Sequence, residues 1–436
     1  MTKPNILYIH SHDTGRYIQP FGYRFDTPHM QRLAEDGVLF RQCHCANPTC
    51  SPSRASLVTG TYPHQNGMFG LAHMGWRLNS YDEHIVNMLR QHGYYSVLSG
   101  IQHITSHDGT PDIGYDEWLN PDGPAPHIAA ADWLDKRESG QPFFMSVGFG
   151  ETHREFPEEH PLDDPRYMMP PEPLPDTPDT REDTARYAAY VRKLDDQIGH
   201  VREAFERNGE WENTLVICTT DHGIAFPRMK CTLTDSGTGV LLIMRGPGGF
   251  EGGGVCDSLV SHVDIVPTLC DLVGIEPPDR LEGFSLMPIA QDPTADIREE
   301  IHAEVNYHSA YEPMRSVRTK RWKYIKRFSG RDKPVLPNTD DSLCKTLWLD
   351  AGWPKIEHEM LFDLILDPNE SRNLVDDPDH GEVLKDMRAR LQRWQERTDD
   401  PILRGQIPPA EGTVYCDIEA PTPYSSHAPF AEHPQW

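Results

Sequence analysis

The stretch CSPSRASLVTG, residues 50–60, has the form C-x-P-S-R-x-x-x-x-T-G and combines a thiol, an arginine and a helix start. We expect Ser51 to be the N-cap and Pro52 the first helical residue, with a helix over 53–58. The first N–H groups of a helix are unpaired and carry partial positive charge. This helix is therefore predicted to present Cys50 beside a site for an anion.

The same form resembles the signature of the type I sulfatases, in which the cysteine is oxidised after translation to formylglycine. The resemblance implies that a formylglycine-generating enzyme converts Cys50, and that the aldehyde takes up water to become a geminal diol. One hydroxyl would attack sulfur and the other would later expel the sulfate. In the family the arginine of the motif, here Arg54, braces the diol. It lies one helical turn past Cys50, because residues i and i+4 share a face.

Composition limits the class of protein. The 436 residues suffice for one large or two ordinary domains, and 37% hydrophobic and 25% charged content is typical of a soluble globular protein. A net charge of −26 argues against nucleic acid or an anionic membrane as a partner, so an anionic substrate would need a local cationic pocket. The absence of a visible signal peptide, and nine cysteines without a framework pattern, favour a cytoplasmic location.

Strand-like and helical segments alternate over residues 1–295, which we predict to be the catalytic domain. The predicted strands are 5–9, 38–42, 94–99, 143–149, 215–220 and 240–244, and the predicted helices are 28–36, 82–92, 182–208 and 263–273. Such alternation predicts an α/β fold with a mixed, mainly parallel sheet flanked by helices. The sulfatase resemblance implies that this fold is alkaline-phosphatase-like. Ligands of such sheets bind outside the carboxyl ends of the strands.

The pattern changes in the last third of the chain. Residues 296–400 contain predicted strands at 299–305, 314–318, 322–326 and 360–364 and then an amphipathic helix over 382–397. Closely spaced strands followed by one helix predict a smaller α+β domain, an antiparallel sheet with a covering helix. Residues 401–436 are rich in proline and are predicted to be an extended tail. The tail would strap across a surface or a partner subunit, which leaves a homo-oligomer open.

Polar residues that suit a metal follow two predicted strands. Type I sulfatases carry two adjacent aspartates after the first strand, and here His12 replaces the first while Asp13 matches the second. Asp221 and His222 resemble the second ligand pair of the family. The resemblance therefore implies a divalent metal held by these four residues and the modified Cys50. Oxygen ligands favour Ca²⁺, our first choice, or Mg²⁺, whereas imidazoles move the preference toward Mn²⁺.

Three further residues match family positions that move protons or contact sulfate. His103, in residues 100–103, matches the histidine that takes a proton from the diol, although Ile101 replaces the family lysine and removes a cation from the sulfate pocket. His153 is the candidate general acid for the leaving group, because imidazole titrates near neutral pH. Lys230 resembles the late lysine or arginine that contacts both the sulfate and the leaving-group oxygen.

Residues 62–68, YPHQNGM, continue the signature and are closest in wording to the sulfamidase subgroup. Segments 313–317 and 394–398 resemble that subgroup too. The expected substrate is therefore a small sulfated carbohydrate, cleaved at a sulfate ester or sulfamate. The candidate substrate-binding residues are His64, His73, Trp76, Arg77 and Arg154.

Two other functions stay open at this point. Phosphonate monoester and phosphodiester hydrolases share the cysteine signature, and Asp221 and His222 with a transition metal would suit them. A non-catalytic sulfated-glycan binder on a sulfatase scaffold would account for Ile101 and His12. The retention of Cys50 and of the candidate proton-transfer residues argues against the second alternative.

Overall fold

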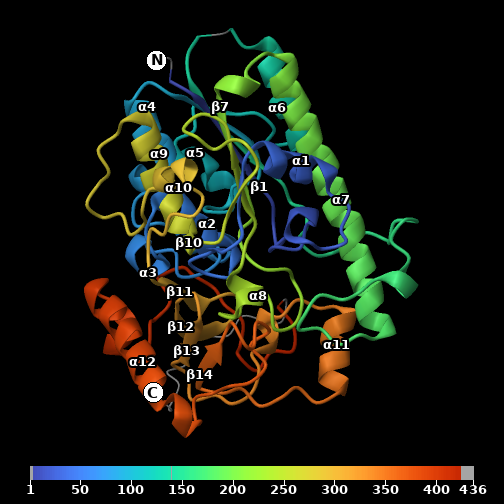
Figure 1. Cartoon of the computed structure of the whole chain (residues 1–436), viewed down its shortest axis with the longest axis vertical. Helices are drawn as coiled ribbons and strands as arrows, with labels where there is room; N and C mark the ends of the chain where they lie inside the picture. The colour runs from blue at the N-terminus through green and yellow to red at the C-terminus, as the bar shows by residue number, and fades with distance from the viewer. Residues whose placement is uncertain (1–2, 139, 424–436) are drawn as a thin grey trace.

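An eight-stranded sheet forms the larger part of the molecule. The computed structural model of the chain describes residues 3–138 and 140–423 (Figure 1). The sheet has the order β5-β4-β6-β1-β7-β8-β2-β9, and only the pairs β7/β8 and β2/β8 are antiparallel. Its strands are β1 Asn5–His10, β2 Val38–Phe40, β4 Tyr95–Gly100, β5 Glu117–Trp118, β6 Phe143–Gly148, β7 Thr214–Thr219, β8 Leu242–Arg245 and β9 Gly254–Cys256. The prediction of a mixed, mainly parallel sheet is confirmed.

Helices cover both faces of this sheet, so its central strands are buried on both sides. The core under one face contains α1 Pro28–Asp36, α6 Pro126–Lys136 and α7 Pro178–Arg207 (Figure 1). The core under the other contains α2 Cys50–Thr59, α4 Ile85–Gln91, α9 Ile265–Val273 and α10 Met287–Gln291. Every residue of β1, β6 and β7 is buried. This burial explains why these strands read as continuous apolar runs rather than as alternating ones.

Helix boundaries were predicted with mixed success. The helix over 28–36 is confirmed, with Thr27 as N-cap and Gly37 as C-cap. The prediction that α7 begins at residue 182 is wrong by one turn: it begins at Pro178, and the Thr177 hydroxyl accepts a hydrogen bond from the Thr180 N–H. Proline at the first helical position is favourable because its missing N–H would be unpaired there anyway.

A second, antiparallel sheet and its helix form a smaller C-terminal domain. The strands β11 Ile301–Tyr307, β12 Tyr311–Arg318, β13 Trp322–Arg327 and β14 Glu359–Asp363 pair in chain order. The helix α12, Gly381–Arg397, packs Leu391 and Trp394 against Val317 and Tyr324 of the sheet. The predicted antiparallel sheet with one covering helix is therefore confirmed. No helix among the described residues is long and apolar enough to span a membrane.

Polar contacts join the C-terminal sheet to the first part of the chain. The Glu304 N–H of β11 donates to the Ala46 carbonyl at 3.0 Å, and Arg318 of β12 forms an ion pair of 2.9 Å with Asp235 in the first part of the chain. In the tail, the Val414 N–H donates to the Met74 carbonyl at 2.8 Å. The part of the tail that the structure describes, up to residue 423, thus lies against its own chain. The predicted division at residue 295 falls between α10 and β11.

Candidate active site

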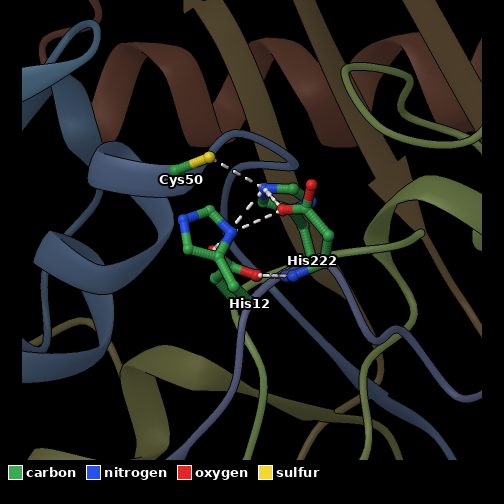
Figure 2. Close-up of side chains that lie close together, drawn as sticks. His12, Cys50 and His222 are labelled. Carbon is green, nitrogen blue, oxygen red and sulfur yellow. Dashed lines mark hydrogen bonds and ion pairs between the residues drawn. The ribbon is translucent and has the colours of Figure 1, made fainter. Parts of the chain in front are cut away.

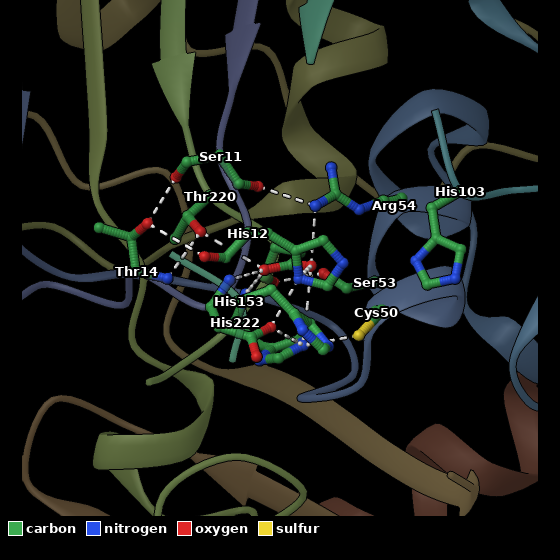
Figure 3. A network of polar contacts seen from close by, with 12 residues as sticks. Ser11, His12, Thr14, Cys50, Ser53, Arg54, His103, His153, Thr220 and His222 are labelled. Atoms are coloured by element: carbon green, nitrogen blue, oxygen red, sulfur yellow. Dashed lines mark hydrogen bonds and ion pairs between the residues drawn. The ribbon is translucent and has the colours of Figure 1, made fainter. Parts of the chain in front are cut away.

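The site forms where four parallel strands end side by side. β4, β6, β1 and β7 are consecutive neighbours in the sheet and run in the same direction. Just beyond their carboxyl ends lie His103, His153, the pair 12–13 and the pair 221–222, respectively. Figure 3 shows the four histidines His12, His103, His153 and His222 gathered around the start of α2. The sheet topology thus assembles the predicted metal and proton-transfer residues from distant parts of the sequence.

The helix that carries Cys50 begins earlier than predicted. α2 starts at Cys50 with Thr49 as N-cap, so the assignment of Ser51 as N-cap is wrong. The Ser51 hydroxyl instead accepts a hydrogen bond of 2.9 Å from the Ala72 N–H. Pro52 therefore lies third in the helix, still within the first turn, where its missing N–H costs little. All ten residues of α2 are buried, and Cys50 is its first residue.

Five side chains form a compact, buried donor cluster. The ligand atoms of His12, Asp13, Cys50, Asp221 and His222 all lie within 4.8 Å of one another. Figure 2 shows the Cys50 sulfur and the two imidazoles directed toward the same point. His222 Nδ1 donates to the Gly223 carbonyl at 2.9 Å, and its Nε2 lies 3.4 Å from Cys50 Sγ. A carbonyl that fixes the imidazole tautomer in this way is typical of metal-binding histidines.

Carboxylates and neutral imidazoles together suit a divalent cation. His12 Nδ1 lies 2.7 Å from Asp13 Oδ1 and 3.2 Å from Asp221 Oδ2. Burial lowers the pKa of His12 to about 4, although both carboxylates oppose this. The imidazole is therefore neutral at pH 7 and can serve as a ligand. The structure brings together all five predicted metal-site residues.

Arg54 connects the nucleophile helix to the strand ends. Its Nη2 donates to Asp221 Oδ2 at 2.9 Å and to the Ser11 carbonyl at 2.8 Å (Figure 3). Its Nη1 lies 2.5 Å from His10 Nδ1. The side chain is only 3% exposed. Arg54 therefore holds a metal-site carboxylate in a fixed position relative to α2.

Lys230 is a buried cation between two carboxylates. Its Nζ lies 2.8 Å from Asp13 Oδ2 and 3.2 Å from Asp340 Oδ2. Burial alone would lower the pKa of Lys230, but the two carboxylates raise it well above its usual value. Burial also opposes ionisation of Asp13, yet Lys230 and the nearby histidines hold its pKa well below the usual range. Both groups are charged at neutral pH.

Asp340 was missed by the sequence analysis. It lies in the loop between the short helix Leu336–Asn338 and α11, Leu343–Asp350, far along the chain from the signature. No local pattern distinguishes it from the many other acidic residues. Its proximity to Lys230 could be found only from the packing of the C-terminal domain on the first sheet.

A pocket of about 730 Å³ opens beside the cluster. Its lining includes His12, His73, His103, His153 and Ile101, and none of its lining residues is a lysine or arginine. His73 Nδ1 lies 3.1 Å from His103 Nε2. Burial, and then the neighbouring His12, lower the pKa of His103 well below its usual value, so this imidazole is neutral and can accept a proton. The pocket is therefore rich in imidazoles and poor in permanent cations.

Two site residues have strained backbones. Asp13 and His103 have φ angles of 53° and 55°, in the left-handed region. Non-glycine residues adopt this region rarely and at an energetic cost. Strain of this kind concentrates at functional sites, where the surrounding structure holds it in place.

Of the five predicted substrate-binding residues, one lines the pocket and four do not. His73 lines the pocket. Arg77 is 61% exposed and forms an ion pair of 2.8 Å with Asp112. Arg77 does not line the pocket, and neither do His64, Trp76 and Arg154.

These three side chains have buried protein partners instead. His64 Nδ1 bonds Glu304 Oε2 at 2.6 Å, and Trp76 packs against Tyr307 with ring centroids 4.8 Å apart. Arg154 donates two hydrogen bonds to the Asp183 carboxylate, at 2.8 and 2.6 Å. In this structure they join parts of the fold through His64 Nδ1, the Trp76 ring and the Arg154 guanidinium.

Comparison with known proteins gives the family. The Sulfatase family model matches residues 4–126 and 128–275, and the model for the C-terminal part of N-sulphoglucosamine sulphohydrolase matches residues 229–339. The chain is 28% identical to an ulvan-active sulfatase of Formosa agariphila (90% of this chain, 74% of the relative). It is 29% identical to human N-sulphoglucosamine sulphohydrolase (86% of each chain).

A solved structure has a similar fold. It is a protein in complex with its substrate D-glucosamine-2-N,6-O-disulfate, with a TM-score of 0.74 at 18% identity over 92% of this chain and 99% of that chain. The family match, the fold and the gathered donor cluster agree with what the signature around Cys50 predicted. The chain belongs to the sulfatase family.

Proposed function

We propose that this sulfatase removes the sulfate of a small amino sugar, with an N-sulfated glucosamine as the first candidate substrate. The observation that carries the proposal is the position of Cys50 at the start of α2, inside a buried cluster of two carboxylates and two imidazoles. The match to the sulphoglucosamine sulphohydrolase C-terminal model supports the choice of substrate. So does the similarity to the human enzyme of that name over most of both chains.

The residues around Cys50 can divide the reaction between them. As a hydrated aldehyde, residue 50 offers one hydroxyl to form the new S–O bond while the bond from sulfur to the leaving nitrogen or oxygen breaks. Lys230 is charged, and its ammonium lies 2.8 Å from Asp13 of the donor cluster. From this position it offsets negative charge on the sulfonyl oxygens of a substrate bound at residue 50. His153 lines the pocket and donates the proton that the leaving group needs. His103, a neutral imidazole, takes the proton of the second hydroxyl, so that sulfate leaves and the aldehyde returns.

The donor cluster fits a divalent cation, and His12, Asp13, Asp221 and His222 would hold it together with residue 50. Such a cation supplies Lewis-acid stabilisation of negative charge. Two carboxylates suit Ca²⁺, our first choice, whereas the two imidazoles bring Mn²⁺ into competition. Arg54 keeps the Asp221 carboxylate oriented toward the cluster.

The test is turnover by protein produced together with a formylglycine-generating enzyme. Release of inorganic sulfate is measured from glucosamine N-sulfate, glucosamine 6-O-sulfate and 4-nitrophenyl sulfate, and hydrolysis of a phosphonate monoester is measured in parallel. We expect the highest kcat/KM on a glucosamine sulfate. A higher kcat/KM on the phosphonate would contradict the proposal and favour the phosphonate hydrolase alternative.

The variant Cys50→Ser gives an independent check of the chemistry. Serine has one hydroxyl, so it can accept the sulfonyl group but cannot expel it afterwards. We expect a sulfated serine, detected by mass spectrometry of the peptide that carries residue 50, and no sustained turnover. Multiple turnovers at the rate of the converted enzyme would exclude the diol mechanism.

A further inference from the structure

Asp340 brings a carboxylate from the C-terminal domain to the reaction centre. Its Oδ2 lies 3.2 Å from Lys230 Nζ, and the same ammonium lies 2.8 Å from Asp13 Oδ2. Asp13 belongs to the donor cluster, whereas Asp340 does not. One cation is therefore shared by a metal-site carboxylate and by a carboxylate with no part in that cluster.

The loop that carries Asp340 is anchored on both sides. Before it, Asn338 accepts a hydrogen bond of 2.8 Å from the Ala310 N–H and donates one of 2.9 Å to Glu312. After it, Lys345 donates to the Thr339 carbonyl at 2.8 Å and to Asp341 at 2.7 Å. These contacts fix the backbone around Asp340. The carboxylate is thus held beside Lys230 by the fold, and not only by attraction to the ammonium.

Asp340 also retains hydrogen-bonding capacity. Its side chain is 11% exposed, and in the described part of the chain Oδ2 is buried with the ion pair to Lys230 and no hydrogen bond of good geometry. A carboxylate can accept about four hydrogen bonds. Buried acceptors without donors are uncommon in native proteins, and a ligand group is one way to satisfy them.

The position of Asp340 has a consequence for the substrate. Lys230 is the cation proposed to contact the sulfate and the leaving atom. Asp340 does not line the pocket of about 730 Å³, but its contact with the same ammonium places its carboxylate on the side of the proposed sulfate position, toward the substituent on the neighbouring sugar carbon. A hydroxyl or amino group there could donate to Asp340. A second sulfate there would meet a like charge in a region of low exposure, where repulsion is strong.

We propose that Asp340 is a specificity-determining residue that accepts a hydrogen bond from a hydroxyl or amino group next to the scissile sulfate and excludes a second sulfate at that position. The inference rests on the proposed function and narrows its substrate to sugars with an uncharged or cationic neighbour of the scissile group. Selection by a repulsive element as well as an attractive one is a common route to specificity.

The experiment compares two substrates that differ only in that neighbour: glucosamine N-sulfate, and glucosamine with sulfate on both N2 and O3. We expect wild type to prefer the monosulfated sugar. In Asp340→Asn the ratio of kcat/KM between the two should shift toward the disulfated sugar by about tenfold or more.

Asp341→Asn is the matched control, because Asp341 is the adjacent residue but pairs with Lys345. Its ratio should equal that of the wild type. Asp340→Ser provides a second variant if Asp340→Asn folds poorly, and Asp340→Glu, which keeps the charge, should continue to reject the disulfated sugar. Thermal unfolding of each variant verifies folding.

The outcomes separate the two proposals. An unchanged ratio in the folded variants, or an equal loss of kcat/KM on both sugars, would overturn the specificity role of Asp340 and leave the sulfatase proposal standing. A wild type that releases sulfate from none of these sugars, in converted form, would overturn the proposed function itself.

Discussion

Arg54 and Asp221 form a buried ion pair, with Nη2 and Oδ2 separated by 2.9 Å and side-chain exposures of 3% and 0%. The pair connects α2, which carries Cys50, to the residues just beyond β7, which carry two of the candidate metal ligands. Removing one partner of a buried pair leaves an uncompensated charge. The candidate nucleophile and the candidate metal site are therefore coupled through one guanidinium.

Arg54→Lys tests this coupling. A lysine cannot reproduce the planar group that reaches His10, Ser11 and Asp221 together. We expect kcat/KM and metal affinity both to fall about 10- to 100-fold. The control is Arg32→Lys, in the exposed pair with Asp36, which should leave both unchanged. Wild-type metal affinity in Arg54→Lys would show that Asp221 needs no such support.

His12→Asp tests the replacement of a family oxygen ligand by nitrogen. The substitution adds a carboxylate and removes one of two imidazoles from the donor cluster. We expect the affinity for Ca²⁺ relative to that for Mn²⁺ to rise about tenfold, so the ratio of the Mn²⁺ to the Ca²⁺ dissociation constant increases. Calorimetric titration of the metal-free protein measures this ratio without any turnover. An unaltered ratio would indicate that His12 is not a ligand.

His153→Ala tests the general acid. Its kcat should fall about 10²- to 10⁴-fold on a sugar sulfate, whose leaving group needs a proton, and much less on 4-nitrophenyl sulfate. His107, which lines the same pocket but is 62% exposed, provides the control His107→Ala. Equal losses on the two substrates would assign the acid to another residue.

The pH dependence of stability offers a test away from the site. Burial lowers the pKa of His84 to about 3 in the folded protein, against about 6.5 in the unfolded chain. Below pH 6.5 the unfolded chain binds a proton that the folded state does not, so the free energy of unfolding decreases as pH falls from 6.5 toward 3. His84 alone contributes a slope of about 1.4 kcal/mol per pH unit.

His84→Asn should remove the contribution of one proton from the pH dependence of the free energy of unfolding. The asparagine keeps an acceptor for the Val86 N–H, which donates to His84 Nδ1 at 3.1 Å in the wild type. His160 makes the same local hydrogen bond, to the Leu162 N–H, on an exposed side chain. His160→Asn is therefore the matched control and should leave the slope unchanged. Urea titrations between pH 6.5 and 4 provide the measurement, and identical slopes for the two variants would contradict the assignment.

The sequence predicted those parts of the site that short motifs and sheet topology determine. His103, His153, Asp13 and Asp221 each lie just beyond a strand, and consecutive parallel strands bring their carboxyl ends together. The start of α2 was misplaced because Ser51 resembles an N-cap but bonds the backbone of a distant loop. Local helix-capping preference does not take account of a hydrogen bond to a segment elsewhere in the chain.

Tertiary packing determined the remainder. The motifs predicted His64 and Arg154 to bind substrate. In the structure His64 is hydrogen-bonded to Glu304 and Arg154 to Asp183. Conversely, Asp340 has no motif and reaches Lys230 only because the C-terminal domain packs on the first sheet. Contacts between segments this far apart depend on the whole arrangement of the core, which residue spacing does not encode.

The burial of Cys50 bears on when the protein can mature. The side chain is 2% exposed at the start of a helix without a solvent-facing residue, and burial raises the pKa of the thiol well above its usual value. A thiol in this condition is out of reach for another protein and is a poor nucleophile. The enzyme proposed to oxidise it is therefore expected to act on the nascent or unfolded chain, and protein that folds before conversion would lack the proposed diol until it unfolds again.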